Sequence, residues 1–209
     1  MFYQEVHDNA LRFGDVVQGY IKSSSKIENT ISNLNDFKYK IDIELPQFSV
    51  ILTPCCSIKE NSITLAPLIK IRKNFFENTY FAEDLTRINR RIEPQNIMSS
   101  EKWDKLSYDE QQDRLKEGTS FAVPNLFIYE LNNLFPQYPV KLSGETREIN
   151  YYMIDFKDTY KINCDKITKP QNALVNSKCL QLSVKTRSEL RDKLSSFYGR
   201  VPREDQCEL

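Results

Sequence analysis

The sequence predicts an α+β protein, and three patterns of apolar residues support this prediction. Between residues 12 and 72, short β-branched runs alternate with Gly, Pro and Ser turns, which is typical of antiparallel strands. Residues 73–118 are rich in charge and contain no glycine before Gly118, which indicates a helical insertion. Residues 119–182 return to β character, and residues 183–203 carry an apolar stripe at helical spacing. We expect these segments to form a single domain spanning residues 1–209.

The first strands are predicted from turn residues and from the alternation of apolar with polar side chains. Gly14 and Asp15 punctuate the chain before an apolar run that starts at Val16, so we expect a strand to begin there. Residues 22–36 are rich in Ser and Asn, which predicts a long loop. Residues 37–45 then alternate strictly between apolar and charged side chains, which predicts a half-buried strand with its polar face in water. The apolar positions are Phe37, Tyr39, Ile41, Ile43 and Leu45.

A hairpin is expected next. Residues 48–53, "FSVILT", are continuously apolar, which predicts a strand that is covered on both faces. The polar segment 55–62 forms the turn, and residues 63–71 form the partner strand, broken or bent at Pro67.

Later elements are marked by capping residues. Ser107 and Glu110 have the spacing of a capping box, so a helix is expected to run from there to Gly118. Residues 121–131 and 148–162 have β character, and we expect both to rejoin the first sheet.

The C-terminal helix is predicted from its cap and its stripe. Thr186 and Glu189 have capping-box spacing, Gly199 suits the C-terminal end, and Pro202 stops continuation. The apolar stripe consists of Leu190, Leu194, Phe197 and Val201.

Charge and hydropathy restrict the partners of the chain. Lys plus Arg and Asp plus Glu both number 29, so a polyanion would have to bind to a local patch and not to a global field. No apolar run approaches the roughly 18 residues of a membrane span, and the N-terminus lacks a signal-peptide core. We expect a cytoplasmic protein without a membrane partner.

Thiol and metal chemistry are not favoured by the cysteine pattern. The five cysteines are Cys55, Cys56, Cys164, Cys179 and Cys207. A catalytic thiolate needs a base, and the only histidine is His7, in an N-terminal segment that we expect to be mobile. A structural zinc needs about four suitably spaced ligands, but the neighbouring side chains Cys55 and Cys56 would point to opposite faces at a strand end. No glycine-rich phosphate loop occurs either. We therefore predict no catalytic residue, metal or cofactor, and a structural role for the paired cysteines.

Two groups of cations are candidate contacts for DNA or RNA. One group interleaves with aromatic residues between positions 72 and 91, the combination used for phosphate contact and base stacking. The other lies on the C-terminal helix. Both groups suit a solvated surface or an acidic protein partner equally well. The candidates are Arg72, Lys73, Arg87, Arg90, Arg91, Arg187 and Arg191.

An aromatic cluster in the insertion is a candidate protein-binding surface. Phe75, Phe76, Tyr80 and Phe81 are natural interface anchors if they are exposed. The alternative is that they close over the core.

A resemblance to a known family rests on "GDVVQGYI", "FSVILTPCCSI" and "ITLAPLI". In order and character these stretches resemble the MazF/PemK-like toxins over the first third of the chain. The resemblance implies an SH3-like, partly open β-barrel. That family cleaves single-stranded RNA with an arginine before the second strand and a threonine near the end of the third. Here Pro46 with Gln47, and Ile69, stand at those places, which implies a barrel without its catalytic residues.

A second resemblance involves both ends of the chain. "ILTPCCSI" and "QLSVKTRSELRDKLSSFYGRVP" resemble a strand end ("LSQTCDL"-like) and a C-terminal helix of small, poorly characterised bacterial proteins, with Ser57 replacing an acidic residue. Such proteins are associated with phage-defence and mobile-element loci. The resemblance implies a non-enzymatic accessory or adaptor subunit of an anti-phage defence or toxin-antitoxin-like complex. Its partner would be a larger nuclease or NTPase subunit. The alternatives are a diverged MazF/PemK-like endoribonuclease and a nucleic-acid-binding module.

Overall fold

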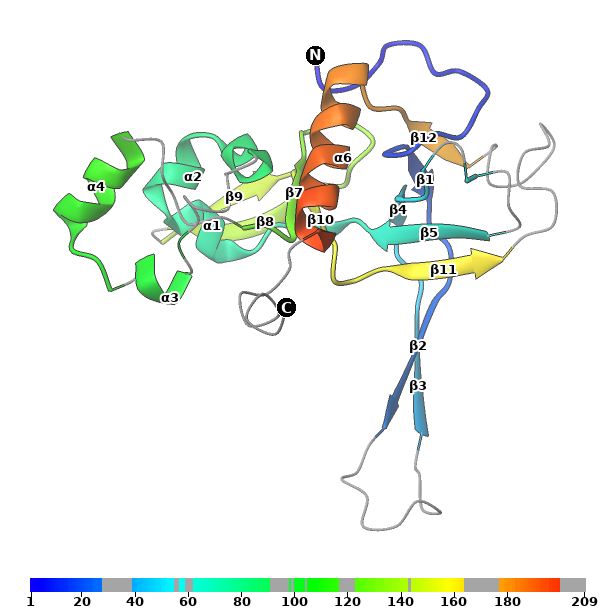
Figure 1. The fold of residues 1–209 in the computed structure, drawn as a ribbon, viewed down its shortest axis with the longest axis horizontal. Helices are drawn as coiled ribbons and strands as arrows, with labels where there is room; N and C mark the ends of the chain where they lie inside the picture. Colours follow the sequence, from blue (N-terminus) through cyan, green and yellow to red (C-terminus); the bar gives the residue numbers. More distant parts are fainter. Residues whose placement is uncertain are drawn as a thin grey trace, which may run out of the picture. The chain divides into compact units, whose positions relative to one another are not determined.

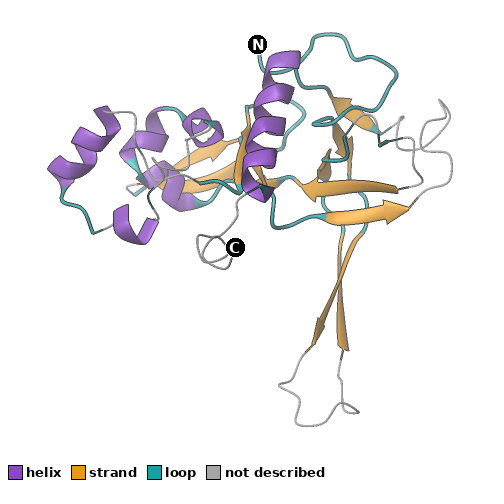
Figure 2. Cartoon of the chain, viewed as in Figure 1, coloured by secondary structure: helices purple, strands orange, loops and turns teal. Residues whose placement is uncertain are grey.

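The structure is a computed structural model of the 209-residue chain. It describes residues 1–27, 39–54, 57–58, 62–90, 98, 100–103, 105–116, 123–142, 144–163 and 177–199. The chain forms two compact units (Figures 1 and 2). The first unit comprises Met1–Ile69 and Lys157–Ser183, and the second comprises Lys70–Phe156 and Val184–Leu209.

The first unit is built on a five-stranded antiparallel sheet in the order β11-β5-β4-β1-β12. The strands are β1 (Val16–Gln18), β4 (Phe48–Ile51), β5 (Ser62–Pro67), β11 (Tyr160–Asn163) and β12 (Lys178–Leu180). Gly14 has a positive φ of 84° in the turn before β1, a conformation that suits glycine. The predicted hairpin is confirmed as β4 and β5, and every residue of β4 is buried.

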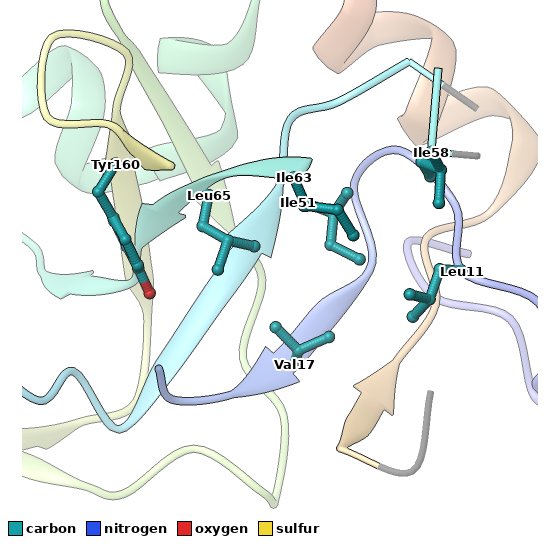
Figure 3. Close-up of a cluster of buried hydrophobic side chains, with 7 residues drawn as sticks. All are labelled: Leu11, Val17, Ile51, Ile58, Ile63, Leu65 and Tyr160. Carbon is teal, nitrogen blue, oxygen red and sulfur yellow. The ribbon is translucent and has the colours of Figure 1, made fainter. Parts of the chain in front are cut away.

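The core of the first unit gathers aliphatic side chains from neighbouring strands (Figure 3). Val17, Ile51, Ile63 and Leu65 are all inaccessible to solvent. Leu11 and Ile58 join them from outside the strands, and Tyr160 joins from β11. Burying this apolar surface is the main stabilising contribution to the unit.

A two-stranded ribbon extends away from this sheet within the first unit (Figure 1). It consists of β2 (Lys22–Ile27) and β3 (Tyr39–Glu44), paired antiparallel. The predicted loop is therefore wrong for residues 22–27, because the cross-strand pairing overrides their low β propensity. The strand predicted at 37–45 is present over Tyr39–Glu44, and Phe37 lies outside the described residues, but the expected half-burial is wrong. Ile41 and Ile43 are 67% and 70% exposed.

The N-terminal segment is held in the first unit and is not the mobile segment that we expected. Tyr3 and Leu182 form an isolated antiparallel bridge, and Gln4 N donates to Gln181 O at 2.9 Å. Phe2 is only 8% exposed. These contacts fix the segment beside the chain that follows β12.

The second unit contains a three-stranded sheet, a hairpin and helices. The sheet has the order β6-β10-β7, with β6 (Ile69–Lys70), β7 (Leu126–Tyr129) and β10 (Tyr152–Asp155). The hairpin pairs β8 (Tyr138–Leu142) with β9 (Glu145–Ile149). The helices are α1 (Lys73–Glu77), α2 (Thr79–Glu83), the 3₁₀ helix η1 (Leu85–Asn89), α3 (Ser100–Trp103), α4 (Tyr108–Lys116) and α6 (Val184–Tyr198).

Sheet membership differs from the prediction after residue 119. Both β7 and β10 were expected to rejoin the first sheet, but they pair with each other in the second unit. The strand predicted at 148–162 is divided by a turn after Asp155, so β10 and β11 belong to different sheets. The chain also changes sheet between β5 and β6, immediately after the predicted break at Pro67.

Local capping shapes the helices of the second unit. Side-chain oxygens of Asn78 and Asp84 accept hydrogen bonds from the backbone two residues later, which divides the insertion into short helices. The predicted capping box of α4 is confirmed, because Ser107 N donates to Glu110 Oε2 at 2.8 Å and Glu110 N donates to Ser107 Oγ at 3.4 Å. Gly118 lies outside the described residues.

The C-terminal helix predicted within residues 183–203 is present, but the capping box predicted at Thr186 and Glu189 does not mark its start. Helix α6 begins at Val184, so Thr186 lies within the first turn, where it is 4% exposed and does not cap the helix. Leu190 is fully buried, and Gly199 follows the last helical residue. Val201 and Pro202 lie outside the described residues.

The predicted α+β class is confirmed, since helices accompany mostly antiparallel sheets. The described strands do not form a closed barrel: the first sheet is open, with β11 and β12 at its two edges.

Candidate functional site

The described cysteine has the character of a structural thiol. Cys179 is half-buried, and its Sγ donates to Ser177 O at 3.2 Å. Burial raises the pKa of the Cys179 thiol, which makes the reactive thiolate scarcer. His7 is exposed. Cys55, Cys56, Cys164 and Cys207 lie outside the described residues, so the structural role predicted for the pair Cys55 and Cys56 remains a prediction. Among the described residues, no group of three or more His, Cys, Asp and Glu side chains is placed to hold a metal ion.

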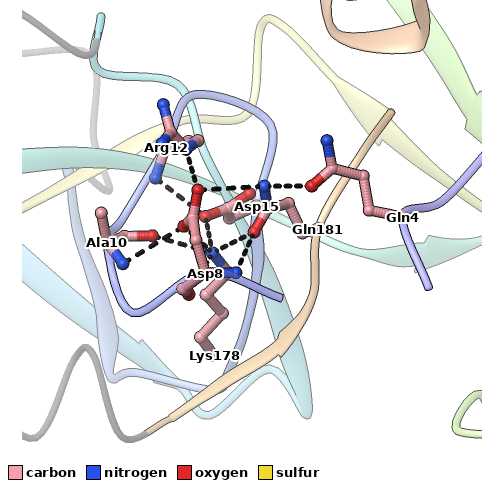
Figure 4. Close-up of polar contacts among 7 residues, drawn as sticks. All are labelled: Gln4, Asp8, Ala10, Arg12, Asp15, Lys178 and Gln181. Carbon is pink, nitrogen blue, oxygen red and sulfur yellow. Dashed lines mark hydrogen bonds and ion pairs between the residues drawn. The ribbon is translucent and has the colours of Figure 1, made fainter. Parts of the chain in front are cut away.

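A buried polar cluster centres on the ammonium group of Lys178, which is 4% exposed (Figure 4). Its Nζ lies 2.9 Å from Asp15 Oδ2, and the Asp15 side chain is fully buried. Nζ also donates to Gln181 Oε1 at 2.7 Å and to Ala10 O at 2.8 Å. Asp8 supplies two further oxygens at 3.2 Å. The ammonium therefore has five acceptors close to its three N–H donors.

This polar cluster links the N-terminal segment to β12, and we call it the Lys178 clasp. Burial opposes ionisation of Asp8, but hydrogen bonds from Arg12 and Lys178 outweigh it and lower the pKa of Asp8 to about 2. Asp8 thus stays charged and bound to these cations above that pH. Because the Lys178 donors are saturated by the chain itself, the ammonium is not placed to act as a nucleophile or base.

The aromatic cluster predicted as a partner surface is largely internal to the second unit. Phe75 and Phe81 are 4% and 2% exposed, and their rings meet edge to face at 5.6 Å. Both rings are internal because they pack together between α1 and α2, so neither is available as an exposed anchor. Phe76 and Tyr80 are half-buried, and the Arg87 guanidinium lies 4.7 Å from the centre of the Tyr80 ring. The alternative that these residues close over a core fits Phe75 and Phe81.

The first predicted group of cations is matched by carboxylates. Arg72 Nη2 lies 3.0 Å from Asp155 Oδ2, and Lys73 Nζ lies 2.7 Å from Glu77 Oε1. Arg87 and Arg90 also have acidic neighbours: Arg87 Nη1 lies 2.7 Å from Glu83 Oε2, and Arg90 Nη2 lies 4.0 Å from Asp84 Oδ2. Exposed ion pairs of this kind contribute little to stability, but they reduce the positive field that would attract phosphate.

In the second predicted group, on the C-terminal helix, an arginine also has an acidic neighbour. Arg191 Nε lies 3.8 Å from Asp192 Oδ1. Arg187, from the same group, is half-buried. Arg91, from the first group, lies outside the described residues. Burial raises the pKa of Glu130, and the negative charges of Asp84 and Glu189 act in the same direction. Nucleic-acid contact by these residues stays a prediction, and the charge arrangement does not favour it.

The most distinctive exposed feature is one face of the β2–β3 ribbon. Alternation along β3 places Ile41 and Ile43 on one face, and Leu45 continues the series. These side chains are 67%, 70% and 73% exposed. Across the ribbon, Ser25 pairs with Ile41 and Ser23 pairs with Ile43, and Ile21 continues that row with 63% exposure. We call Ile21, Ser23, Ser25, Ile41, Ile43 and Leu45 the Ile41 face.

The opposite face of the ribbon is charged and anchored. Lys22 Nζ lies 2.6 Å from Asp158 Oδ1 and 3.2 Å from Glu44 Oε2, and the Lys22 side chain is only 14% exposed. Burial disfavours the ammonium, but these two carboxylates outweigh it and raise the pKa of Lys22. These ion pairs hold Lys22, the first residue of β2, and the side chains of Ile41 and Ile43 on the other face are exposed.

Sequence reasoning found the strand of the Ile41 face but not its exposure. Strict alternation in 37–45 predicts one apolar face, and it does not say whether another element covers that face. The Ser-rich β2 was the available clue, since a partner strand with small polar side chains adds little apolar surface to a core.

Comparison with family models, with curated proteins and with solved structures finds no match to this chain. Within the described part of the chain, none of the helices combines the length and the apolar character needed to cross a membrane.

Proposed function

We propose that this protein is a non-enzymatic accessory or adaptor subunit that binds a larger catalytic partner through the Ile41 face. The observation that carries the proposal is a continuous row of solvent-exposed aliphatic side chains on a projecting ribbon. Exposed aliphatic residues that gather on one face mark interaction sites, whereas single ones are ordinary. The proposed setting is a bacterial anti-phage defence or toxin-antitoxin-like complex, and the proposed partner is a nuclease or NTPase subunit.

Two further features support an adaptor. The cations predicted to contact nucleic acid have acidic neighbours within the second unit, which favours a protein partner over a polyanion. The Lys178 clasp and the buried core belong to the same compact unit as the ribbon, so the Ile41 face is presented by a packed unit. We also propose that the open sheet of this unit is a diverged SH3-like barrel.

Capture of the partner from cells that encode the protein tests the proposal. Tagged wild-type chain is expected to retain a nuclease or NTPase subunit, and Ile41→Glu is expected to lose it, because a carboxylate would be buried in an apolar interface. The matched control is Lys40→Glu, which places the same side chain one residue away on the opposite face.

Retention by wild type and Lys40→Glu, with loss in Ile41→Glu, would support the adaptor function. Equal capture by all three chains would contradict the use of this face. Specific cleavage of single-stranded RNA by the purified protein would contradict the non-enzymatic function itself.

A further inference from the structure

We infer that a second copy of this chain covers the Ile41 face when the catalytic partner is absent. The inference rests on the proposed function, because it assumes that the face binds protein. It adds self-association as the means by which the free protein shields its aliphatic row from water.

The uncharged character of the Ile41 face favours a second copy. None of the described residues of the Ile41 face is ionisable, whereas the opposite face of the ribbon carries Lys22, Lys26, Lys40, Asp42 and Glu44. Two Ile41 faces can therefore meet without bringing like charges together and without burying an ion. A partner with a charged surface would leave its ions unpaired there.

The shape of the face is self-complementary. Ile41 and Ile43 are large side chains along β3, and their cross-strand partners, Ser25 and Ser23, are small. A two-fold axis parallel to the strands, midway between two facing ribbons, exchanges the positions of β2 and β3. The large side chains of each copy then lie over the small side chains of the other at the usual sheet-to-sheet separation of about 10 Å. In this arrangement Ile41 of one copy faces Ser25 of the other.

The size of the face predicts a weak dimer. A stable interface buries roughly 800 Å² on each partner, and a short row of aliphatic side chains covers a few hundred Å². Self-association is therefore expected only at high protein concentration. Such a dimer gives way readily to a larger partner that binds the same residues more tightly.

Sedimentation equilibrium of the purified full chain tests the inference over about 5 to 500 µM, since mass action makes dimerisation concentration-dependent. Wild type and Lys40→Glu are expected to show a reversible monomer–dimer equilibrium. Ile41→Glu is expected to weaken the dimer at least about tenfold. Circular dichroism would verify that each variant is folded. A wild type that stays monomeric across the range would overturn the inference, and so would a dimer that Ile41→Glu leaves unchanged.

A charge-pair experiment tests the geometry. Ile41→Lys and Ser25→Glu are each expected to dimerise more weakly than wild type. Their mixture is expected to form a heterodimer, because the ammonium introduced in one copy then faces the carboxylate introduced in the other. Absence of that rescue would overturn the two-fold arrangement in which Ile41 of one copy faces Ser25 of the other.

The two proposals fail in different ways. If the protein is monomeric but its capture of a partner still depends on Ile41, only the proposed self-association is contradicted. If the protein dimerises but captures no partner, only the proposed adaptor function is contradicted.

Discussion

The two-stranded ribbons β2–β3 and β8–β9 share a pattern and differ in burial. Each pairs two antiparallel strands and alternates apolar with polar side chains on one of them. In β8, Tyr138 and Val140 are 4% and 8% exposed, so its apolar face is covered within the second unit. In β3, Ile41 and Ile43 are mostly exposed. The same alternation thus gives a core face in one unit and an open face in the other.

The difference comes from residues distant in sequence. The Tyr138 ring meets the Tyr152 ring edge to face at 5.5 Å, its hydroxyl donates to Tyr151 O at 2.6 Å, and it accepts from Ile71 N at 3.0 Å. Helix α1 also packs against β8. In the described first unit, the Ile41 face has no such cover. An apolar ribbon face is therefore stabilising only when other elements of the fold are brought over it.

Loss of the Tyr138 side chain, which packs the β8–β9 ribbon into the second unit, should reduce the free energy of unfolding most. Tyr138→Ala deletes a buried ring and leaves Ile71 N and Tyr151 O without their hydroxyl partner. We expect a loss of about 3–5 kcal/mol in the free energy of unfolding, measured by urea denaturation. Tyr138→Phe, the control, keeps the ring and should lose about 1–2 kcal/mol. An unchanged stability in Tyr138→Ala would show that β8 is as dispensable to folding as an exposed ribbon.

A substitution at the base of the exposed β2–β3 ribbon should cause the next largest loss in the free energy of unfolding. Gly19 follows β1, and a Cβ there would lie 1.5 Å from Pro46 O, in the chain that returns from β3. Gly19→Ala must therefore push the two segments apart, and we expect a loss of about 2–3 kcal/mol.

Thermal denaturation would measure this loss, with Gly144→Ala as a control that meets no neighbouring atom but carries a positive φ of 88°. A smaller loss at Gly19 than at Gly144 would contradict the close approach at the ribbon base.

Local pattern predicted much of the secondary structure in this chain. The β4–β5 hairpin, the cap of α4 and the body of α6 follow from continuous apolar runs, capping spacing and an apolar stripe. These features depend on residues close together in sequence, so a single sequence contains the information. The capping box predicted for α6 is wrong because the Thr186–Glu189 spacing matches the capping-box pattern but lies inside the helix.

Long-range pairing was not predictable in the same way. That β10 and β11 belong to different sheets depends on which strands lie beside them, and no local pattern specifies this. The candidate site shows the same limit. For Phe75 and Phe81 the sequence left open both an exposed anchor and a core position, while the alternation of Ile41 and Ile43 predicted a buried face. The structure buries the first pair and exposes the second, because burial is decided by tertiary contacts.

The smallest effect on folding is expected on the Ile41 face. Ile43 is 70% exposed, so Ile43→Ser removes little buried surface and should change the free energy of unfolding by no more than about 0.5 kcal/mol. The matched control is Val140→Ser in the covered ribbon, where a buried β-branched residue is lost and about 2–3 kcal/mol should disappear. Urea denaturation at low protein concentration, where self-association is negligible, measures both. Equal losses at the two positions would mean that the Ile41 face is covered within the monomer, which would remove the structural basis for a docking surface there.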